Sequence, residues 1–333
     1  MTVEVKLFEQ RCNLRCTYCY QQYMRAVEKP RPYDLKKIEQ SLLKQNRVFT
    51  VYGGEALLAP IADLEELWKF SYEHWGHGGV QTNGTLITEA HVELFKRYRV
   101  EVGFSIDGPG DCNKARSSPK LTEATMGWLH RLLDEKLNPS VIATLHRLNA
   151  NDQFIDWMHD LDRRGMRWFN LHLLENDSSD SIKLPESEQI AFLRRLYEQK
   201  FDHMTQALFK EMRGQYWEGK GGSCVWNGCD PYNTQAVQGI WPNGELHNCG
   251  RIAKEGVDWI KSNSHTSMRD DILLSTPQES GGCQGCRYFF ACRGFCPGTG
   301  IDGDWRNRTE HCESLKKIFS WIEEDGICVS VEP

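Results

Sequence analysis

The sequence predicts an α/β fold in which a partial (β/α)6 barrel over residues 1–213 is followed by a cysteine-rich extension over residues 214–333. Over roughly the first 175 residues, short apolar runs alternate with longer helical patterns, as they do in chains of β/α units. From Cys224 onward this alternation gives way to glycine- and cysteine-rich turns. The chain length of 333 residues suits one large domain or two.

Six segments have the length and apolar character of strands: VEVKLF (3–8), VFTVY (48–52), GGVQT (78–82), VEVGFSI (100–106), SVIATL (140–145) and RWFNLHLL (167–174). Five segments between them carry apolar residues at helical spacing: 34–46, 61–75, 88–98, 121–136 and 152–164. Strands that alternate with helices imply parallel pairing through crossover connections. Six such units make an open, partial barrel.

Polar residues mark where two of these helices begin. Thr88 is followed three residues later by His91, and Asn151 stands directly before the fifth helical pattern. Both arrangements are typical of helix N-termini, where a side chain accepts from an unpaired backbone N–H group.

The rest of the chain is expected to close the barrel and then to depend on metal. A long helix over 186–213 closes the barrel, and EGKGGS (218–223) is typical of a flexible boundary. The following segment, to about residue 312, has too few periodic apolar positions for a core of its own, so a bound metal would have to hold it. A last helix is expected over 313–325.

Composition and charge exclude several partners. The net charge is −6 and the chain has no Lys/Arg tract, so nucleic acid is not expected as a partner. No apolar run approaches the ~18 residues of a membrane span. The N-terminal sequence MTVEVKLFE lacks the basic start and apolar core of a secretory signal, so a cytoplasmic location is expected.

The chain has 13 cysteines, which is many for a cytoplasmic protein. A disulfide framework is typical of small secreted domains, so metal ligation is the better interpretation. Three of the cysteines are near the N-terminus and nine lie between Cys224 and Cys328. Cys112 stands alone, and both Cys112 and Cys328 are interpreted as spare thiols.

Cys12, Cys16 and Cys19 form a C-x3-C-x2-C pattern directly after the first strand. A closed structural metal site takes four protein ligands, whereas three ligands leave one position open. The same holds for a four-iron cluster, in which each iron takes one outside ligand. A zinc knuckle with a distant fourth ligand remains the alternative at this point.

This pattern, with Tyr18 before the last cysteine, resembles the radical S-adenosylmethionine (SAM) superfamily. The resemblance implies that SAM binds the free iron of a [4Fe-4S] cluster through its amino and carboxylate groups. It also implies that an electron from the cluster splits SAM into methionine and a 5′-deoxyadenosyl radical, which removes a hydrogen atom from the substrate.

Further motifs of the barrel resemble the SAM-binding positions of this superfamily. "VYGGEALLAP" places Gly53, Gly54 and Glu55 after the second strand, where the superfamily's GGE motif binds the SAM amino group. The resemblance implies SAM contacts at a wider set of positions: Tyr18, Gly53, Gly54, Glu55, Asn83, Ser105, Asp107 and Arg116. All these motifs follow expected strands, and the C-terminal ends of parallel strands carry the chemistry of such barrels.

The C-terminal cysteines resemble the SPASM extension of radical SAM enzymes over roughly residues 224–312. The resemblance implies an iron–sulfur extension with two auxiliary [4Fe-4S] clusters, and so three clusters in the chain. The first auxiliary cluster would use Cys224, Cys229, Cys249 and Cys296, and the second Cys283, Cys286, Cys292 and Cys312. Two structural zinc ions are the alternative, because four cysteines with short spacings also suit zinc.

The expected reaction is the oxidative modification of a ribosomally made peptide, with a crosslink as the leading product. The founding sulfatase-maturing enzymes have an Asp after the cysteine that matches Cys249, and this chain has Gly250 there. This difference puts simple dehydrogenation of a sulfatase Ser or Cys in doubt. His172 and Glu175 belong to or follow the sixth strand and are placed to face a substrate, but no general base is assigned.

Several alternatives stay open. The chain could be a radical SAM dehydrogenase of a small molecule or of a sulfatase-type side chain, a non-catalytic iron–sulfur electron-transfer protein, or a zinc-stabilised binding protein. The expected partners are a precursor peptide and an external reductant of the flavodoxin or ferredoxin type. Because the first strand begins at about Val3, a leader-recognition domain is not expected before it, and a separate leader-binding protein is a possible partner.

Overall fold

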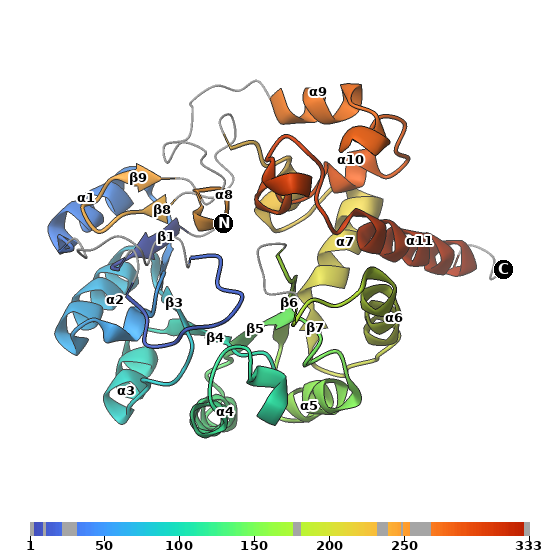
Figure 1. Ribbon diagram of the computed structural model, residues 1–333. Helices are drawn as coiled ribbons and strands as arrows, with labels where there is room; N and C mark the ends of the chain where they lie inside the picture. Colours follow the sequence, from blue (N-terminus) through green and yellow to red (C-terminus); the bar gives the residue numbers. More distant parts are fainter. Residues whose placement is uncertain are drawn as a thin grey trace.

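One mostly parallel β-sheet organises the computed structural model, which describes residues 3–8, 11–21, 32–175, 181–231, 239–247, 249–253 and 268–329. In these residues nine strands form the sheet in the order β7-β6-β5-β4-β3-β2-β1-β8-β9. Strands β1 to β6 follow one another along the chain and pair in parallel with their neighbours. Figure 1 shows helices α1 to α5 in an arc outside these strands.

The six predicted strands and five predicted helices are confirmed. The strands are β1 (Val3–Lys6), β2 (Phe49–Tyr52), β3 (Gly78–Thr82), β4 (Val100–Ser105), β5 (Ser140–Leu145) and β6 (Trp168–Leu173). The helices are α1 (Leu35–Gln45), α2 (Ile61–Trp75), α3 (Glu89–Arg97), α4 (Pro119–Asp134) and α5 (Asp152–Arg163). Crossover helices between parallel strands produce the partial barrel that the sequence predicted.

Along each strand, side chains point alternately to the hydrophobic core and to the interior of the barrel. Apolar residues such as Val5, Val51 and Phe169 are buried in the main hydrophobic core. Their neighbours in sequence, such as Thr50 and Asn170, line a cavity on the opposite face of the sheet. Successive side chains of a strand point to opposite faces, so one face packs against helices while the other presents polar groups to the interior.

Both predicted helix starts are present. The Thr88 backbone N–H donates to Nδ1 of His91 at 3.2 Å, as in a capping box. The Asn151 side-chain oxygen accepts from the Phe154 backbone N–H at 3.1 Å and so caps α5.

The prediction of one long helix over 186–213 is wrong. Two helices occupy this part of the chain, α6 (Glu186–Tyr197) and α7 (Ala207–Glu218), and the two-residue strand β7 (Thr205–Gln206) precedes α7. The carboxylate of Asp162 accepts hydrogen bonds from the backbone N–H groups of Asp202, His203 and Met204 at 2.7–2.9 Å. These bonds hold the intervening turn, which interrupts the helical pattern that the sequence suggested.

Two more short strands extend the sheet at its other edge. Strand β8 (Gly239–Ile240) pairs in parallel with β1, and β9 (Leu246–His247) pairs antiparallel with β8. They belong to the cysteine-rich region, so this region joins the barrel sheet through backbone hydrogen bonds. Two-residue strands carry too little periodicity to be found in a sequence.

The remainder of the extension consists of short helices and turns: α8 (Gly250–Ala253), α9 (Met268–Ser275), α10 (Phe289–Cys292) and a final helix, α11 (Cys312–Val329). The final helix is longer than the predicted 313–325 and packs against α6 and α7 (Figure 1). None of the helices in the described residues is both long and apolar enough to cross a membrane.

Candidate functional site

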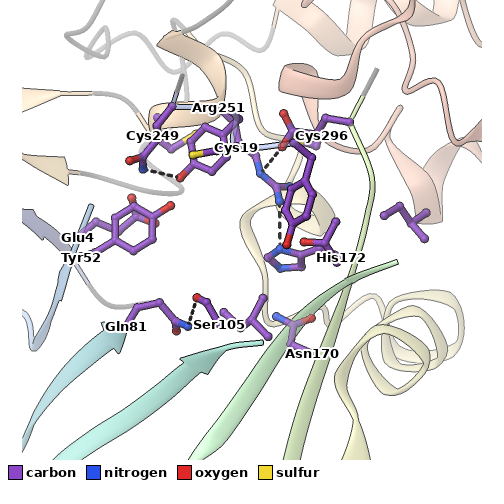
Figure 2. Close-up of a pocket in the computed structure, with 18 of the residues that line it drawn as sticks. Glu4, Cys19, Tyr52, Gln81, Ser105, Asn170, His172, Cys249, Arg251 and Cys296 are labelled. Atoms are coloured by element: carbon purple, nitrogen blue, oxygen red, sulfur yellow. Dashed lines mark hydrogen bonds and ion pairs between the residues drawn. The ribbon is translucent and has the colours of Figure 1, made fainter. Parts of the chain in front are cut away.

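A cavity of about 520 Å³ opens at the C-terminal ends of the barrel strands. Its wall includes Cys12, Cys16 and Cys19, and also Cys224, Cys229, Cys249 and Cys296 from the extension. Figure 2 shows Cys19, Cys249 and Cys296 on the opposite side of this cavity from Gln81, Ser105 and Asn170. The fold therefore brings two cysteine sets from distant parts of the sequence to one chamber.

The three N-terminal cysteines lie within electrostatic reach of one another. Burial raises the pKa of Cys16 to about 11 against the opposing effect of Arg116, and the nearby Cys19 thiol, the Asp107 carboxylate and the Cys12 thiol add to the rise. A metal that binds thiolates removes this penalty, because binding releases the thiol protons. The donor set therefore suits a cluster with three cysteine ligands.

The two glycines of the GGE motif permit close packing against the cysteine loop. Gly53 and Gly54 have φ values of +89° and +57°, a region that favours glycine. A Cβ at Gly54 would lie 2.1 Å from the carbonyl oxygen of Arg11, the residue before Cys12. The same carbonyl accepts from the Glu55 backbone N–H at 2.9 Å. These contacts set the distance between the second strand and the three-cysteine loop.

The Glu55 carboxylate lies at the cavity wall and accepts three hydrogen bonds from the protein. Its oxygens accept from the Thr82 hydroxyl at 2.6 Å, the Asn83 backbone N–H at 2.8 Å and the Leu57 backbone N–H at 3.1 Å. A carboxylate has about four acceptor positions. Glu55 thus ties β2 to the end of β3 and retains capacity for one further donor.

Asp107 does not line the cavity and is instead the centre of a buried network behind it. Its carboxylate accepts from Arg116 at 3.0 Å, from the Thr144 backbone N–H at 2.9 Å and from the Tyr18 hydroxyl, and His146 Nε2 lies 3.3 Å away. Burial opposes its charge, but Arg116 and His146 hold the pKa of Asp107 well below its usual value. Asp107 therefore positions Tyr18 and Arg116 beside the three cysteines.

Arg116 fits the binding of an anionic group in the cavity. Its side chain is 12% exposed, and its Nε is buried without a hydrogen-bond partner in the described part of the chain. The guanidinium lies 5.3 Å from the centre of the Tyr18 ring. A buried donor without a partner is unfavourable, so a carboxylate such as that of SAM would satisfy it.

Asn83 and Ser105, also predicted as SAM contacts, both line the cavity. The Asn83 side chain builds the turn after β3, because its oxygen accepts from the Thr85 backbone N–H at 3.0 Å. The Ser105 hydroxyl accepts from the Gln81 side-chain amide at 2.8 Å, which leaves its own hydrogen available to a ligand.

The cysteines predicted for the first auxiliary cluster come together at the cavity. The hydrogen bond with Cys229, burial, and the thiols of Cys249 and Cys296 all raise the pKa of Cys224 well above its ordinary value. Four thiols that line one cavity and influence one another electrostatically are the kind of donor set that a four-thiolate cluster requires.

The cysteines predicted for the second auxiliary cluster line a separate small cavity, farther into the extension. Its wall includes all four of them, Cys283, Cys286, Cys292 and Cys312, together with aromatic side chains and the basic residues Arg308 and Lys316. Within the residues that the structure describes, no three His, Cys, Asp or Glu side chains converge as ligands of a single metal ion would.

The two remaining cysteines lie apart from these sets. Cys112 is fully buried on a short 3₁₀ helix, where its sulfur lies 3.6 Å from the Gln153 side-chain oxygen and 3.7 Å from that of Asn151. Its interpretation as a spare thiol remains a prediction. The side chain of Cys328 is outside the part of the chain that the structure describes.

Gly250 is closely approached by two side chains. A Cβ there would lie 2.9 Å from Nζ of Lys6 and 3.0 Å from the ring of Tyr20. Contacts this short require a neighbour to move, so an aspartate at this position would disturb Lys6 or Tyr20. The shorter of the two contacts is with Nζ of Lys6, the end of a flexible side chain, so a shift of that chain would relieve it.

Arg251 forms a bridge that sequence reasoning missed. It comes from α8 in the extension, and its Nε lies 2.9 Å from Glu175 while its Nη2 lies 3.1 Å from Nδ1 of His172 (Figure 2). Three further missed residues, Glu4, Gln81 and Asn170, are polar side chains on strands that line the same cavity. Their polar character at alternate strand positions was the signal that could have revealed them.

Comparison with known proteins places this geometry in a family. The model of the radical SAM superfamily matches residues 8–174. The serine-type anaerobic sulfatase-maturating enzyme of Bacteroides thetaiotaomicron is 33% identical, over 86% of this chain and 80% of that enzyme.

Two groups of solved structures share the fold. Native anSMEcpe with bound AdoMet and Cp18Cys peptide superposes with a TM-score of 0.75 at 18% identity, over 98% of both chains. Streptococcus suis SuiB bound to precursor peptide SuiA superposes with a TM-score of 0.59 at 15% identity, over 94% of this chain and 76% of that one. The chain therefore belongs to the radical SAM superfamily, and its cysteine-rich C-terminal region is a SPASM-like extension.

Proposed function

We propose that this protein oxidises a ribosomally made peptide and that the product is an internal crosslink. Enzymes of the superfamily use SAM and a [4Fe-4S] cluster, which together supply a 5′-deoxyadenosyl radical that removes a hydrogen atom from the substrate. The observation that carries the proposal is the shared cavity of about 520 Å³, which is lined by both the three-cysteine set and a four-cysteine set. This volume lies within the roughly 300–1,000 Å³ of typical ligand pockets.

We further propose three [4Fe-4S] clusters. Cys12, Cys16 and Cys19 would hold the SAM-binding cluster, and the two predicted sets of four would hold the auxiliary clusters. A cluster with four thiolate ligands has no open iron, so electron transfer or structural support is the role that suits the auxiliary pair. The mutually interacting thiols of each set, which are buried or partly buried, support this assignment.

The protein groups around the three-cysteine loop would bind and orient SAM. The unpaired Nε–H of Arg116 would meet the SAM carboxylate, and the remaining acceptor position of Glu55 would meet its ammonium group. Asp107 would keep Arg116 and Tyr18 in place through hydrogen bonds. Each group would thus act through charge and fixed geometry.

A second candidate function is the dehydrogenation of a Ser or Cys side chain in a sulfatase-type substrate. It is favoured by the 33% identity with a serine-type anaerobic sulfatase-maturating enzyme. The glycine at position 250 argues against it, because glycine supplies no carboxylate base where the founding sulfatase-maturing enzymes have an Asp. The crosslinking reaction is therefore the leading proposal.

The deciding experiment supplies the anaerobically reconstituted enzyme with SAM, a reductant of the flavodoxin or ferredoxin type, and peptides encoded beside its gene. Crosslinking predicts a product that lacks a pair of hydrogen atoms, resists fragmentation between the joined residues and does not react with a hydrazine reagent. Dehydrogenation predicts an aldehyde that the hydrazine traps. Deuterium on the attacked carbon should appear in 5′-deoxyadenosine in either case, and its absence there would overturn both candidates. If the peptide alone is not modified, a separate leader-binding protein is the partner to add.

A further inference from the structure

Two polar groups of β6 face the cavity: the Asn170 side-chain amide and Nε2 of His172. Asn170 and His172 are two residues apart on this strand, and both line the cavity (Figure 2). Among the described residues, neither the Asn170 side-chain amide nor Nε2 of His172 has a hydrogen-bond partner. Polar groups that line a largely enclosed chamber are costly unless a ligand or water satisfies them.

Arg251 determines which hydrogen-bonding role His172 takes. An arginine N–H is only a donor, so the 3.1 Å contact makes Nδ1 of His172 the acceptor. The proton of the neutral ring then resides on Nε2, which presents an N–H donor to the cavity. Burial, followed by the charges of Arg251 and Arg116, lowers the pKa of His172 to about 3, so the ring is neutral at physiological pH.

The surrounding charges favour a neutral acceptor. The charge of Arg251 is offset by Glu175, which lies 2.9 Å from its Nε, and Glu4 is a second carboxylate in the same wall. A carboxylate on the substrate would approach both of these acids and the nearby thiols. An amide carbonyl would accept from His172 without that repulsion.

The spacing matches a peptide main chain. Residues i and i+2 of a strand are about 6.6 Å apart along its axis, and so are alternate carbonyl groups of an extended peptide. We propose that Asn170 and His172 bind alternate main-chain amides, those of residues i and i+2, of an extended peptide substrate, with Arg251 as the positioning residue that orients His172. This inference rests on the proposed function, because it presumes a peptide substrate. It assigns the peptide to the side of the cavity that β6 forms.

The test is a binding measurement that needs no product. The probe is N-acetyl-trialanine N-methylamide, a neutral main chain without reactive side chains, added to the reconstituted enzyme with SAM. Binding is followed by ligand-observed saturation-transfer NMR. His172→Phe should raise the Kd roughly 2- to 12-fold, which corresponds to the net loss of one neutral hydrogen bond. His172→Gln retains an N–H donor and should restore most of the affinity.

Three controls separate this role from general damage. His159→Phe makes the same exchange on α5, outside the cavity wall, and should leave the Kd unchanged. Asn170→Ala should weaken the probe to a similar degree as His172→Phe. SAM affinity should be the same in every variant.

The outcomes distinguish this inference from the proposed function. Equal probe affinity in wild type and His172→Phe would overturn the proposal that the peptide binds along Asn170 and His172. The absence of saturation transfer to the probe with the wild type would overturn it as well. Acetate competing better than the neutral probe would overturn the choice of a carbonyl group. The proposed function is judged separately, by peptide product mass, and it survives if only the binding test fails.

Discussion

Of the residues around the three-cysteine loop, some line the cavity, and others position those residues through hydrogen bonds. Arg116 has a buried Nε without a partner in the described residues, whereas Asp107 uses its carboxylate on four protein groups. The two residues belong to neighbouring motifs, yet only Arg116 lines the cavity. The difference separates a binding role from a positioning role.

Replacing Arg116 tests the binding role. Arg116→Gln removes a charged donor from the site that we assign to the SAM carboxylate, and the Kd for SAM should rise about 10- to 100-fold. Equilibrium dialysis of SAM against the reconstituted enzyme measures this change. Arg97→Gln is the matched control, because Arg97 is an exposed arginine in a surface ion pair with Glu65. An unchanged SAM affinity in Arg116→Gln would remove Arg116 from the SAM site.

Replacing Glu55 separates its two contributions. Glu55→Ala leaves three donors unpaired, namely the backbone N–H groups of Leu57 and Asn83 and the Thr82 hydroxyl, and should lower the free energy of unfolding by about 3 kcal/mol. It should also weaken SAM binding, because the SAM ammonium loses its carboxylate. Denaturant unfolding and equilibrium dialysis give the two values. Lower stability with unchanged SAM affinity would limit Glu55 to a structural role.

At the scale of elements, ends of helices and turns are held by individual polar side chains. His91 accepts from the Thr88 backbone N–H at the start of α3. The Asp162 carboxylate accepts from three backbone N–H groups in the turn between α6 and β7. The extension depends on a buried arginine in the same way. These contacts fix how the elements connect, where hydrophobic packing alone would leave several arrangements.

His91 should make the stability of α3 depend on pH. Burial lowers the pKa of His91 below the 6.5 of the unfolded chain. The unfolded state therefore takes up the proton first, so this contribution to stability is complete above about pH 6.5 and declines as the pH falls below it. His91→Gln retains a capping side chain without this titration. Thermal unfolding at about pH 7.5 and about pH 6.0 should show a smaller loss for the variant, and parallel losses would contradict the prediction.

Arg269 holds the cysteine-bearing turns of the extension together. It is 1% exposed, and its guanidinium donates to five backbone carbonyl oxygens, those of Arg293, Gly294, Phe295, Trp305 and Asn307. These carbonyls flank the cysteines of both predicted auxiliary sets. Burial lowers its pKa, while thiols of both sets oppose that effect.

Replacing Arg269 should damage both auxiliary sites. Arg269→Met leaves the five carbonyls without their donor, and the reconstituted protein should lose up to about eight iron atoms, four for each auxiliary cluster. Arg269→Lys keeps the charge but lacks the planar group that reaches several carbonyls, so it should rescue only part of the iron. Iron analysis decides the matter, and full iron content in Arg269→Met would show that the turns form without it.

The whole molecule joins its two parts through the sheet, the final helix and the cavity. Strand β8 pairs with β1, α11 packs against α6 and α7, and Arg251 connects the extension to the end of β6. The division after residue 213 remains a proposal. Helix α7 continues to Glu218, and the glycine-rich segment follows it.

Metal content tests the architecture as a whole. The reconstituted protein should be brown and contain about 12 iron atoms, four for each cluster. Replacing Cys12, Cys16 and Cys19 together by alanine should remove about four iron atoms and abolish the release of 5′-deoxyadenosine. The auxiliary sets should retain the remainder. A colourless protein with stoichiometric zinc would contradict all three cluster assignments.

The sequence predicted those features that depend on local patterns. Short apolar runs identified six strands, helical spacing identified five crossover helices, and Thr88 and Asn151 marked two helix starts. Local patterns failed where the cause is a distant contact. Asp162 interrupts the expected helix over 186–213 from about 40 residues away. The short strands β7 and β8 form by pairing with β6 and β1, and β9 forms by pairing with β8.

The candidate site shows the same division. The cysteine spacings and the GGE motif are local features of the sequence, and from them the sequence by itself determined the family and predicted the donor sets. Only the tertiary structure decided that Asp107 supports Arg116 from behind the wall, and that Arg251 reaches across to orient His172. The physical reason is that hydrogen bonds depend on distance and direction in space, and folding brings together groups such as Arg251 and His172 that lie 79 residues apart in the chain.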